Sequence, residues 1–235
     1  MLMRDHLNEV TVHAAASMRL HIPTMFRPTA ARSICNDFGS AGTVLDFSAG
    51  YGGNFLGFLG SRCQRYVGID PNTALKASYE RMFDWIGQHH DHGKEWKLIW
   101  EPAEDVDFSP WHGEVDLVFT SPPYFDLQRY SDQPTQSWKR YGTIEEWLDG
   151  FLFMTLRKLK PCVKRGGHLA LSVADNETFG IRIIDRLVEF CMKRLGLRLL
   201  KVIPYLLPGR PGARIKGKRV GWGQKAEPVL VFQKK

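Results

Sequence analysis

The residues whose types and order could carry chemistry form the segment Thr120-Ser121-Pro122-Pro123-Tyr124. It follows the apolar run 115–119, so we expect a buried strand that delivers a polar tip to one edge of a sheet. The two prolines fix φ, remove both N–H donors and leave the Pro122 carbonyl outside any regular hydrogen-bond ladder. That carbonyl and the Ser121 hydroxyl are two acceptors beside a tyrosine ring, which suits a planar amino group on a heterocycle. A rigid turn without a ligand is the alternative.

A glycine-rich turn precedes this tip in the chain. Residues 43–47 predict a strand, and residues 48–59 predict a turn that enters a helix, which brings backbone N–H groups close to a ligand. Asp46 at the strand end could address a cationic amine. Residues 65–69 predict a second strand, and Asp70 after it occupies the place where nucleoside-binding folds hold a ribose diol. The glycine spacing is not that of a dinucleotide site, and an acid there would repel a pyrophosphate, which favours S-adenosylmethionine.

The two motifs together resemble those of the S-adenosylmethionine-dependent amino-methyltransferases. In that family Ser, Asp or Asn followed by Pro-Pro-Tyr or Pro-Pro-Phe holds an exocyclic nitrogen. Its cofactor motif, Asp-x-Phe-x-Gly-x-Gly, is matched here at Asp46, Gly50 and Gly52. The chain departs from the motif at Ser48, where the family usually has Phe, and carries Phe47 one position earlier. Phe47 could therefore line the cofactor or pack into the core.

The resemblance extends over residues 26–232 and implies further site residues. A basic-Pro step before the first strand helps to hold the methionine end of the cofactor in the family, and Arg27-Pro28 matches it loosely; a plain helix start is the alternative. An acidic loop after the third strand contacts the adenine there. The implied cofactor-binding residues are Arg27, Pro28, Asp46, Phe47, Ser48, Ala49, Gly50, Gly52, Asp70, Ala103, Glu104 and Thr120, and the implied catalytic residues are Ser121, Pro122, Pro123 and Tyr124.

The alternation of strand and helix patterns predicts the fold class. Residues 43–203 alternate, and two consecutive strands joined by a loop follow, which predicts an α/β sheet that is parallel except for one late antiparallel strand. The resemblance implies a Rossmann-like methyltransferase sheet of seven strands. The expected strands are residues 43–47, 65–69, 96–100, 115–119, 166–173, 197–204 and 227–232, and the expected helices are residues 29–38, 54–59, 73–90, 143–159 from a Thr143/Glu146 capping box, and one capped by Asp175 or Asn176.

Length and composition indicate one large core. With 235 residues, 43% of them hydrophobic, we expect a single domain over residues 1–235, in which 1–22 is a flanking segment. No apolar run approaches the length of a membrane span.

The four cysteines are dispersed without Cys-x-x-Cys, which predicts reduced thiols in a cytoplasm and no metal centre. A histidine cluster, His89, His90 and His92, is more typical of a solvated helix end than of a metal site.

The positive charge is concentrated near the C-terminus. Residues 194–235 hold eleven Lys or Arg against one acid, Glu227, whereas the first 193 residues are slightly acidic. We expect two loops, 125–142 and 205–225, to contact nucleic acid, because the first interleaves cations with aromatic rings and the second is rich in glycine and proline and cannot be regular structure. The expected contacts are Arg129, Lys139 and Arg140 in the first loop and Arg210, Arg214, Lys216, Lys218 and Arg219 in the second.

These features predict methyl transfer from S-adenosyl-L-methionine to the exocyclic nitrogen of adenine (N6) or cytosine (N4), in DNA more than in RNA. Many restriction-type relatives carry a separate recognition domain, which we do not find here. The DNA sequence would then be recognised by the two loops or by a specificity partner protein, or the protein would have hardly any sequence specificity. Two alternatives remain: an RNA base amino-methyltransferase, and a catalytically silent, cofactor-binding nucleic-acid module.

Overall fold

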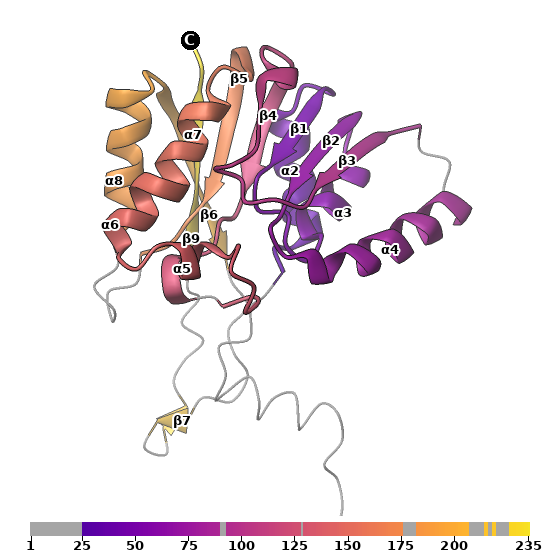
Figure 1. Ribbon diagram of the computed structural model, residues 1–235. Helices are drawn as coiled ribbons and strands as arrows, with labels where there is room; N and C mark the ends of the chain where they lie inside the picture. Colours follow the sequence, from indigo (N-terminus) through magenta and orange to yellow (C-terminus); the bar gives the residue numbers. More distant parts are fainter. Residues whose placement is uncertain are drawn as a thin grey trace, which may run out of the picture.

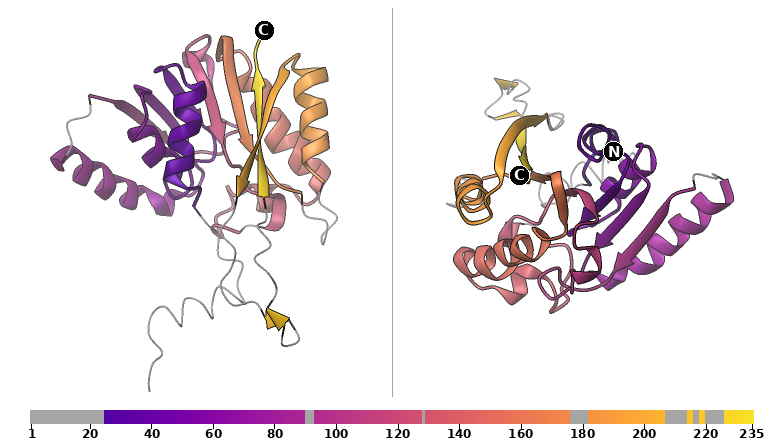
Figure 2. Two further views of the ribbon diagram at one scale, coloured as in Figure 1. Left: turned by 180° about the vertical axis from the view of Figure 1, so that it is seen from behind. Right: turned by 90° about the horizontal axis from the view of Figure 1, so that it is seen from above.

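A seven-stranded sheet with helices on both faces forms the body of the molecule (Figures 1 and 2). The computed structural model describes residues 25–89, 93–127, 129–175, 182–206, 214–215, 218–219 and 226–235. The strand order is β3-β2-β1-β4-β5-β9-β6. All neighbouring strands pair in parallel except β9, which runs antiparallel to both β5 and β6. The predicted α/β class, with one late antiparallel strand, is confirmed.

The elements fall close to the predicted segments. The strands are β1 (Thr43–Asp46), β2 (Arg65–Ile69), β3 (Glu95–Ile99), β4 (Val115–Thr120), β5 (Val163–Ser172), β6 (Arg198–Leu206), β7 (Arg214–Ile215), β8 (Lys218–Arg219) and β9 (Ala226–Gln233). The α-helices of six or more residues are α2 (Pro28–Phe38), α3 (Gly53–Leu59), α4 (Lys76–His89), α7 (Met154–Leu159) and α8 (Ile184–Glu189). Shorter helical segments are η1 (Thr73–Leu75), η2 (Ser109–Trp111), η3 (Phe125–Leu127), α5 (Ser137–Arg140), α6 (Ile144–Trp147), η4 (Leu148–Phe153) and η6 (Phe190–Arg194).

One of two predicted helix starts is confirmed by its hydrogen bonds. The Glu146 amide donates to the Thr143 hydroxyl and the Thr143 amide donates to the Glu146 carboxylate, both at 3.2 Å. This capping box opens the predicted helix, which continues from α6 through η4 to the end of α7. The other predicted helix start was wrong, because α8 begins at Ile184 with Ile183 as its N-cap residue. Asp175 lies eight residues before Ile183, although its Oδ1 accepts from the Ile184 amide at 2.9 Å. The other proposed cap, Asn176, lies outside the described residues.

Two boundary predictions were wrong. Strand β5 begins at Val163, not at residue 166, because the predicted glycine turn is a bulge inside the strand: Gly166 has a φ of +76° and the pairing with β4 shifts register there. Residues 205–225 were expected to lack regular structure, yet β6 runs on to Leu206, since its ladder with β9 continues to that point. The short pair β7 and β8 also lies within that range. Residues 207–213, 216–217 and 220–225 lie outside the described part of the chain.

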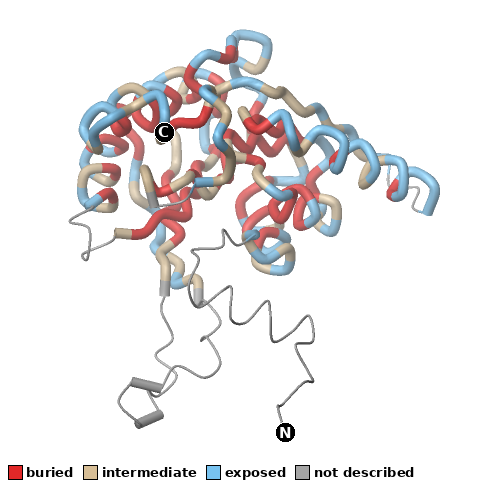
Figure 3. Tube along the Cα trace, turned by 60° about the horizontal axis from the view of Figure 1, so that its bottom comes forward, coloured by how far each residue is buried: buried red, intermediate tan, exposed pale blue. Residues whose placement is uncertain are grey.

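The core consists of two clusters of buried side chains, one on each face of the sheet. Because side chains alternate along a strand, Val118 of β4 belongs to the cluster beneath the helices α6 to α8, whereas Leu117 and Phe119 belong to the cluster beneath α2 and α3. Figure 3 shows the buried residues gathered along the sheet and the inner sides of the helices. The four cysteines are buried and unpaired. The sheet therefore gives the residues at its carboxyl edge a rigid support.

Candidate active site

A cavity lies at the carboxyl edge of the sheet, where the chain leaves β1, β2, β3 and β4. It holds about 840 Å³ of space that atoms do not fill, part of it open to solvent. One wall comes from the turns after the four strands and another from segments 25–26 and 130–137. The residues around it are Met25, Phe26, Phe47, Ser48, Ala49, Gly50, Tyr51, Gly53, Asn54, Asp70, Pro71, Asn72, Leu75, Pro102, Ala103, Glu104, Ser121, Pro123, Tyr130, Thr135, Gln136, Ser137 and Phe151.

The glycine-rich turn after β1 is shaped by left-handed backbone and close packing. Gly50 and Gly52 have φ values of +51° and +86°, which favour glycine. At Gly53 a Cβ would collide with the Phe26 carbonyl oxygen, so only glycine lets segment 25–26 approach the turn. The Tyr79 hydroxyl of α4 binds the carbonyls of Ala49 and Gly50, each at 3.1 Å. The turn is thus held from two sides, and Ser48, Ala49 and Gly50 line the cavity as predicted.

Asp70 lies at the cavity wall directly after β2. Its Oδ2 accepts from the Gly50 amide and its Oδ1 from the Asn72 amide, both at 2.8 Å. Only 8% of the residue is exposed, and this burial raises the pKa of the carboxyl group to about 6. Each carboxylate oxygen keeps acceptor capacity beyond the backbone bond it already makes. A fixed carboxylate of this kind is what recognition of a ribose diol requires.

Asp46 does not line the cavity, which corrects the prediction that it addresses a cationic amine directly. It is fully buried behind the turn, where its carboxylate accepts from the Ser48 amide at 3.1 Å, the Asn54 Nδ2 at 2.9 Å and the Tyr66 hydroxyl at 3.0 Å. Burial raises its pKa. Asn54, which does line the cavity, keeps its buried Oδ1 without a partner among the described residues. Asp46 therefore orients an amide whose carbonyl oxygen is left as an acceptor.

Segment 129–142 forms a wall of the cavity that sequence reasoning missed. The Thr135 hydroxyl donates to the Pro71 carbonyl at 3.2 Å, and the side chain of Gln133 exchanges two hydrogen bonds with Thr73. These bonds bring Gln136 to the cavity, where it is 6% exposed and its Nε2 has no partner among the described residues. In the sequence, this wall was recognisable only as a long polar segment directly after the tip of β4. Such a segment is usually functional, but its composition does not say that it lines the cavity.

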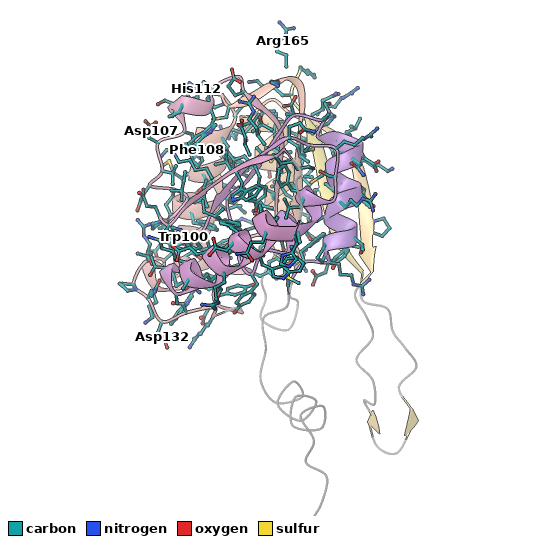
Figure 4. The ribbon with its side chains drawn as sticks, turned by 90° about the vertical axis from the view of Figure 1, so that its right-hand side faces the viewer. Trp100, Asp107, Phe108, His112, Asp132 and Arg165 are labelled. Carbon is teal, nitrogen blue, oxygen red and sulfur yellow. The ribbon has the colours of Figure 1, made fainter. Side chains whose placement is uncertain are left out.

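The cations of this segment have internal partners. Arg129 pairs with Asp126 at 2.7 Å and lies 4.6 Å from the centre of the Trp138 ring. The ammonium group of Lys139 lies 3.7 Å from the carboxylate of Asp132, which projects at the cavity end of the molecule, whereas Arg165 projects from the opposite end (Figure 4). These pairs are exposed on at least one side and can exchange for phosphate. Contact with nucleic acid by Arg129 and Lys139 stays a prediction.

Arg140 pairs with two acids of the loop after β3, and its expected contact with a phosphate stays a prediction. Its guanidinium group lies 2.8 Å from both Glu104 and Asp105, and its side chain is 28% exposed. Glu104 also accepts from the Tyr141 hydroxyl at 3.0 Å, and burial raises the pKa of the Glu104 carboxyl group. Ala103 and Glu104 both line the cavity, and their contact with an adenine stays a prediction. Arg140 fixes the loop that carries them.

Arg27 and Pro28 lie beside the cavity and are not part of its described wall. Pro28 opens α2, and the backbone amide of Arg27 donates to the Tyr205 hydroxyl at 3.2 Å. The two preceding residues, Met25 and Phe26, line the cavity instead. The ring of Phe26 stacks on Tyr205 at 4.4 Å between centroids. The predicted cavity contact just before this helix lies two residues earlier than expected, because Pro28 has to start the helix.

The tip of β4 reaches the cavity through Ser121 and Pro123. Among the described residues, no N–H or O–H group donates to the Pro122 carbonyl. Tyr124 is 8% exposed, and its hydroxyl donates to Glu227 Oε2 at 3.0 Å. Burial first, and then the charge of Glu227, raise the pKa of Tyr124 well above its usual value.

The remaining expected cofactor residues divide between wall and core. Phe47 does both, since it lines the cavity and packs edge-on against Phe151 at 6.3 Å between ring centroids. Gly52 and Thr120 belong to the turn and to the end of β4, behind the wall. No group of three His, Cys, Asp or Glu side chains in the described segments could hold a metal ion. Within the same segments, every helix is too short or too polar to cross a membrane.

Comparisons with known proteins agree with this geometry. A family model described as DNA methylase, for N6 and N4 methyltransferases, matches residues 115–235. No curated protein matches the chain.

Solved structures share the fold at low identity. The 1,6-didemethyltoxoflavin-N1-methyltransferase of Burkholderia thailandensis, with S-adenosylhomocysteine bound, is 12% identical with a TM-score of 0.56, over 97% of this chain and 86% of that one. A putative rRNA methylase of Clostridium thermocellum is 15% identical with a TM-score of 0.53, over 91% and 100% of the two chains. TrmN of Thermus thermophilus is 17% identical with a TM-score of 0.53, over 94% and 51%.

Proposed function

The chain belongs to the N6/N4 DNA methylase family, and on this premise we propose that it methylates the exocyclic amino group of adenine (N6) or cytosine (N4) in DNA. It is a methyltransferase whose cofactor is S-adenosyl-L-methionine. One observation carries the proposed target: a single cavity is lined both by the turn of residues 48–50 and by Ser121 and Pro123 at the tip of β4. Direct transfer needs the methyl donor and the acceptor nitrogen in contact, and a shared cavity provides this.

The residues of the cavity fit this cofactor. Asp70 offers a buried carboxylate to the ribose diol, and Ala103 and Phe47 offer apolar surface to the adenosyl group. Two side-chain amides at the wall have buried atoms without partners in the described part of the chain: Asn54 Oδ1, an acceptor, and Gln136 Nε2, a donor. Buried polar groups are nearly always hydrogen-bonded in proteins. An adenosyl amino acid that carries an ammonium group and acceptor atoms would satisfy both.

Asn54 takes over the amine recognition that the sequence suggested for Asp46. Its Nδ2 donates to the Asp46 carboxylate, so the amide is held in one orientation and its Oδ1 is available to an ammonium group. Asp46 has no contact with the ammonium group in this proposal and only orients the Asn54 amide. When bound, S-adenosyl-L-methionine supplies an electrophilic methyl group on its sulfonium sulfur.

Ser121 and Pro122 act on the target amine. The nitrogen lone pair of adenine or cytosine is conjugated into the ring, which makes the amine a poor nucleophile. Hydrogen bonds from its two protons to Ser121 Oγ and to the Pro122 carbonyl favour the pyramidal geometry of the transition state. The nitrogen forms its bond to carbon as the carbon–sulfur bond breaks, becomes cationic, and then releases a proton. No strong base is required, because the proton leaves only after the nitrogen has become cationic.

A base in duplex DNA has to leave the helix to reach this cavity. Stacking of the flipped base on the ring of Tyr124 is part of the proposal, and it requires the tip to move, because Tyr124 is 8% exposed and is not among the residues around the cavity. The backbone would be held by the exposed cations Arg129 and Lys139 and by the basic segment 205–225, where Arg214 and Arg219 face each other in the register of the pair β7 and β8. Arg210 and Lys216 of the same proposal lie outside the described residues. A specificity partner protein remains part of the proposal for sequence recognition.

The test is to incubate the protein with methyl-labelled S-adenosyl-L-methionine and separate DNA and RNA pools, then to analyse the nucleosides by mass spectrometry. We expect label in N6-methyladenine or N4-methylcytosine from DNA. A matched sample of Ser121→Ala identifies label that comes from a contaminating enzyme. Label in RNA nucleosides alone would overturn DNA as the substrate, and label in neither pool, with cofactor bound, would overturn base methylation.

A further inference from the structure

Two exposed side chains belong to the wall of the cavity. Eight large apolar or aromatic side chains are exposed in the described part of the chain, and two of them, Met25 and Tyr51, line the cavity. Tyr51 lies between Gly50 and Gly52 in the turn after β1 and is 43% exposed. Single exposed apolar side chains are ordinary, whereas exposed apolar side chains grouped at a cavity are typical of a binding site. The open side of the cavity therefore offers apolar surface to a ligand.

The ring of Tyr51 contacts a second aromatic ring that comes from another wall of the cavity. The centroids of Tyr51 and Tyr130 lie 5.9 Å apart, and the two ring planes are inclined at 55°. Tyr130 also lines the cavity and is half-buried. Segment 125–130 leads to it directly from the tip of β4. The aromatic pair therefore joins the turn of the cofactor half to the segment that leaves the target tip.

A tyrosine ring at this place fits a nucleobase. Every base has a flat π face, and stacking on an aromatic ring tolerates any of them. A tyrosine also loses little conformational entropy when it is covered, because only two side-chain torsions have to be fixed. Phe47 and Phe151 are buried in the wall, and Tyr124 is not part of the wall. Tyr51 is thus a ring that a base arriving from solvent can contact without a movement of the tip.

We propose that Tyr51 is a substrate-contacting residue, whose ring is the platform on which the target base stacks at the open side of the cavity, and that Tyr130 holds this ring in place. The inference rests on the proposed function, because it assumes that a base enters this cavity. Residues 48–50 line the cavity for the cofactor, and the next residue in the chain contacts the base. One turn would then place the methyl donor and the acceptor base side by side, as direct transfer requires.

The test compares Tyr51→Ala and Tyr51→Phe with the wild type on the DNA pool. We expect Tyr51→Ala to lower kcat/KM for DNA about 10-fold, the order of effect found when one base–aromatic stacking contact is removed. Tyr51→Phe keeps the ring and should stay within about 2-fold of the wild type. The cofactor Kd should stay within about 2-fold and the melting temperature within about 2 degrees, since position 51 is exposed. Leu56→Ala, at an exposed position of α3 outside the cavity wall, is the matched control.

The outcomes separate this inference from the function on which it rests. An active wild type with unchanged kcat/KM in Tyr51→Ala overturns the platform alone. A loss of cofactor affinity as large as the loss of kcat/KM would make Tyr51 part of the cofactor site, and an equal loss in Tyr51→Phe would attribute the effect to the hydroxyl group; either result overturns the platform. A wild type that methylates no DNA overturns the proposed function, and this inference with it.

Discussion

The cofactor half and the target half of the cavity are built in different ways. In the cofactor half, the carboxylates of Asp46 and Asp70 are already bonded to the backbone and side chains of the turn that they support. In the target half, the Pro122 carbonyl has no described donor and the tip is tied through Tyr124 to Glu227. In the proposed function, the first half would be preorganised for the cofactor, and the second half would leave its acceptors for the target base.

The prediction with the largest expected effect concerns DNA affinity, which we expect to depend on positive charges outside the cavity. Replacing Arg214, Lys216, Lys218 and Arg219 by Ala should flatten the slope of log DNA affinity against log salt by about 2–4 units, since each neutralised phosphate contributes about −0.9. Titrations at several salt concentrations measure this slope. Cofactor affinity should stay the same, because the cofactor half is separate. An unchanged slope would move the contact surface to Arg129 and Lys139.

The next prediction concerns cofactor affinity and Asp70, whose carboxylate lies directly after β2. Asp70→Ala should weaken S-adenosyl-L-methionine binding by about 1–3 kcal/mol, the range for leaving buried hydroxyl donors unpaired. Calorimetry measures the affinity, and Asp84→Ala on the exposed face of α4 is the control. Retention of wild-type affinity by Asp70→Ala would remove this residue from the site.

The same carboxylate predicts a pH dependence of cofactor binding. Burial raises the pKa of Asp70 to about 6, so the group is ionised at pH 7 and increasingly protonated toward pH 5. Because the ionised form accepts from the ribose hydroxyls, affinity should fall as the pH falls through 6, and Asp70→Asn should flatten that profile. The pH dependence of folding stability has the opposite sign. An acid whose pKa is raised in the folded protein lowers the free energy of unfolding above that pKa, and this loss is relieved as the pH falls. Parallel calorimetry and thermal melts at pH 5 and 7 should therefore move in opposite directions.

A smaller effect belongs to the wall formed by segment 129–142. Gln136→Met removes a buried Nε2 that has no partner in the described structure, so the free protein should become no less stable. Cofactor affinity should fall by about 0.5–1.5 kcal/mol, the net value of one hydrogen bond. Gln64→Met, at an exposed position, is the control. Unchanged affinity would leave this wall without a part in cofactor recognition.

Features that depend on residues close together in the sequence could be predicted from it, and features that depend on contacts between distant residues could not. Strands, the Thr143/Glu146 cap and the positions of Gly50, Asp70 and Ser121 depend on local patterns, and these were predicted. The wall around Gln136 depends on bonds to residues 71–73, about sixty positions away, and no local pattern encodes them. The predicted β5 boundary failed for a related reason, since a glycine pair predicts a turn whether it ends a strand or bulges within one.

Two predicted site residues have contacts with residues distant in the sequence. Asp46 was expected in the cavity, but Tyr66 on the neighbouring strand draws its carboxylate into the core, and Asn54 takes its place at the wall. Arg140 was expected at a phosphate, which stays a prediction, and its guanidinium group contacts Glu104 and Asp105, thirty-six and thirty-five positions away. In both cases the residue type indicated a charge interaction, and only the fold identified the partner.

The most direct test of the two-half account is a single-turnover experiment with Ser121→Ala. Wild type and variant are loaded with methyl-labelled S-adenosyl-L-methionine, mixed with DNA, and quenched over time, and the cofactor Kd is measured on the same samples. We predict an unchanged Kd and a transfer rate that falls about 10²-fold, the effect of removing one group that stabilises a transition state. Wild-type transfer by Ser121→Ala, or a loss of cofactor affinity in place of rate, would contradict the assignment of this tip to the target amine.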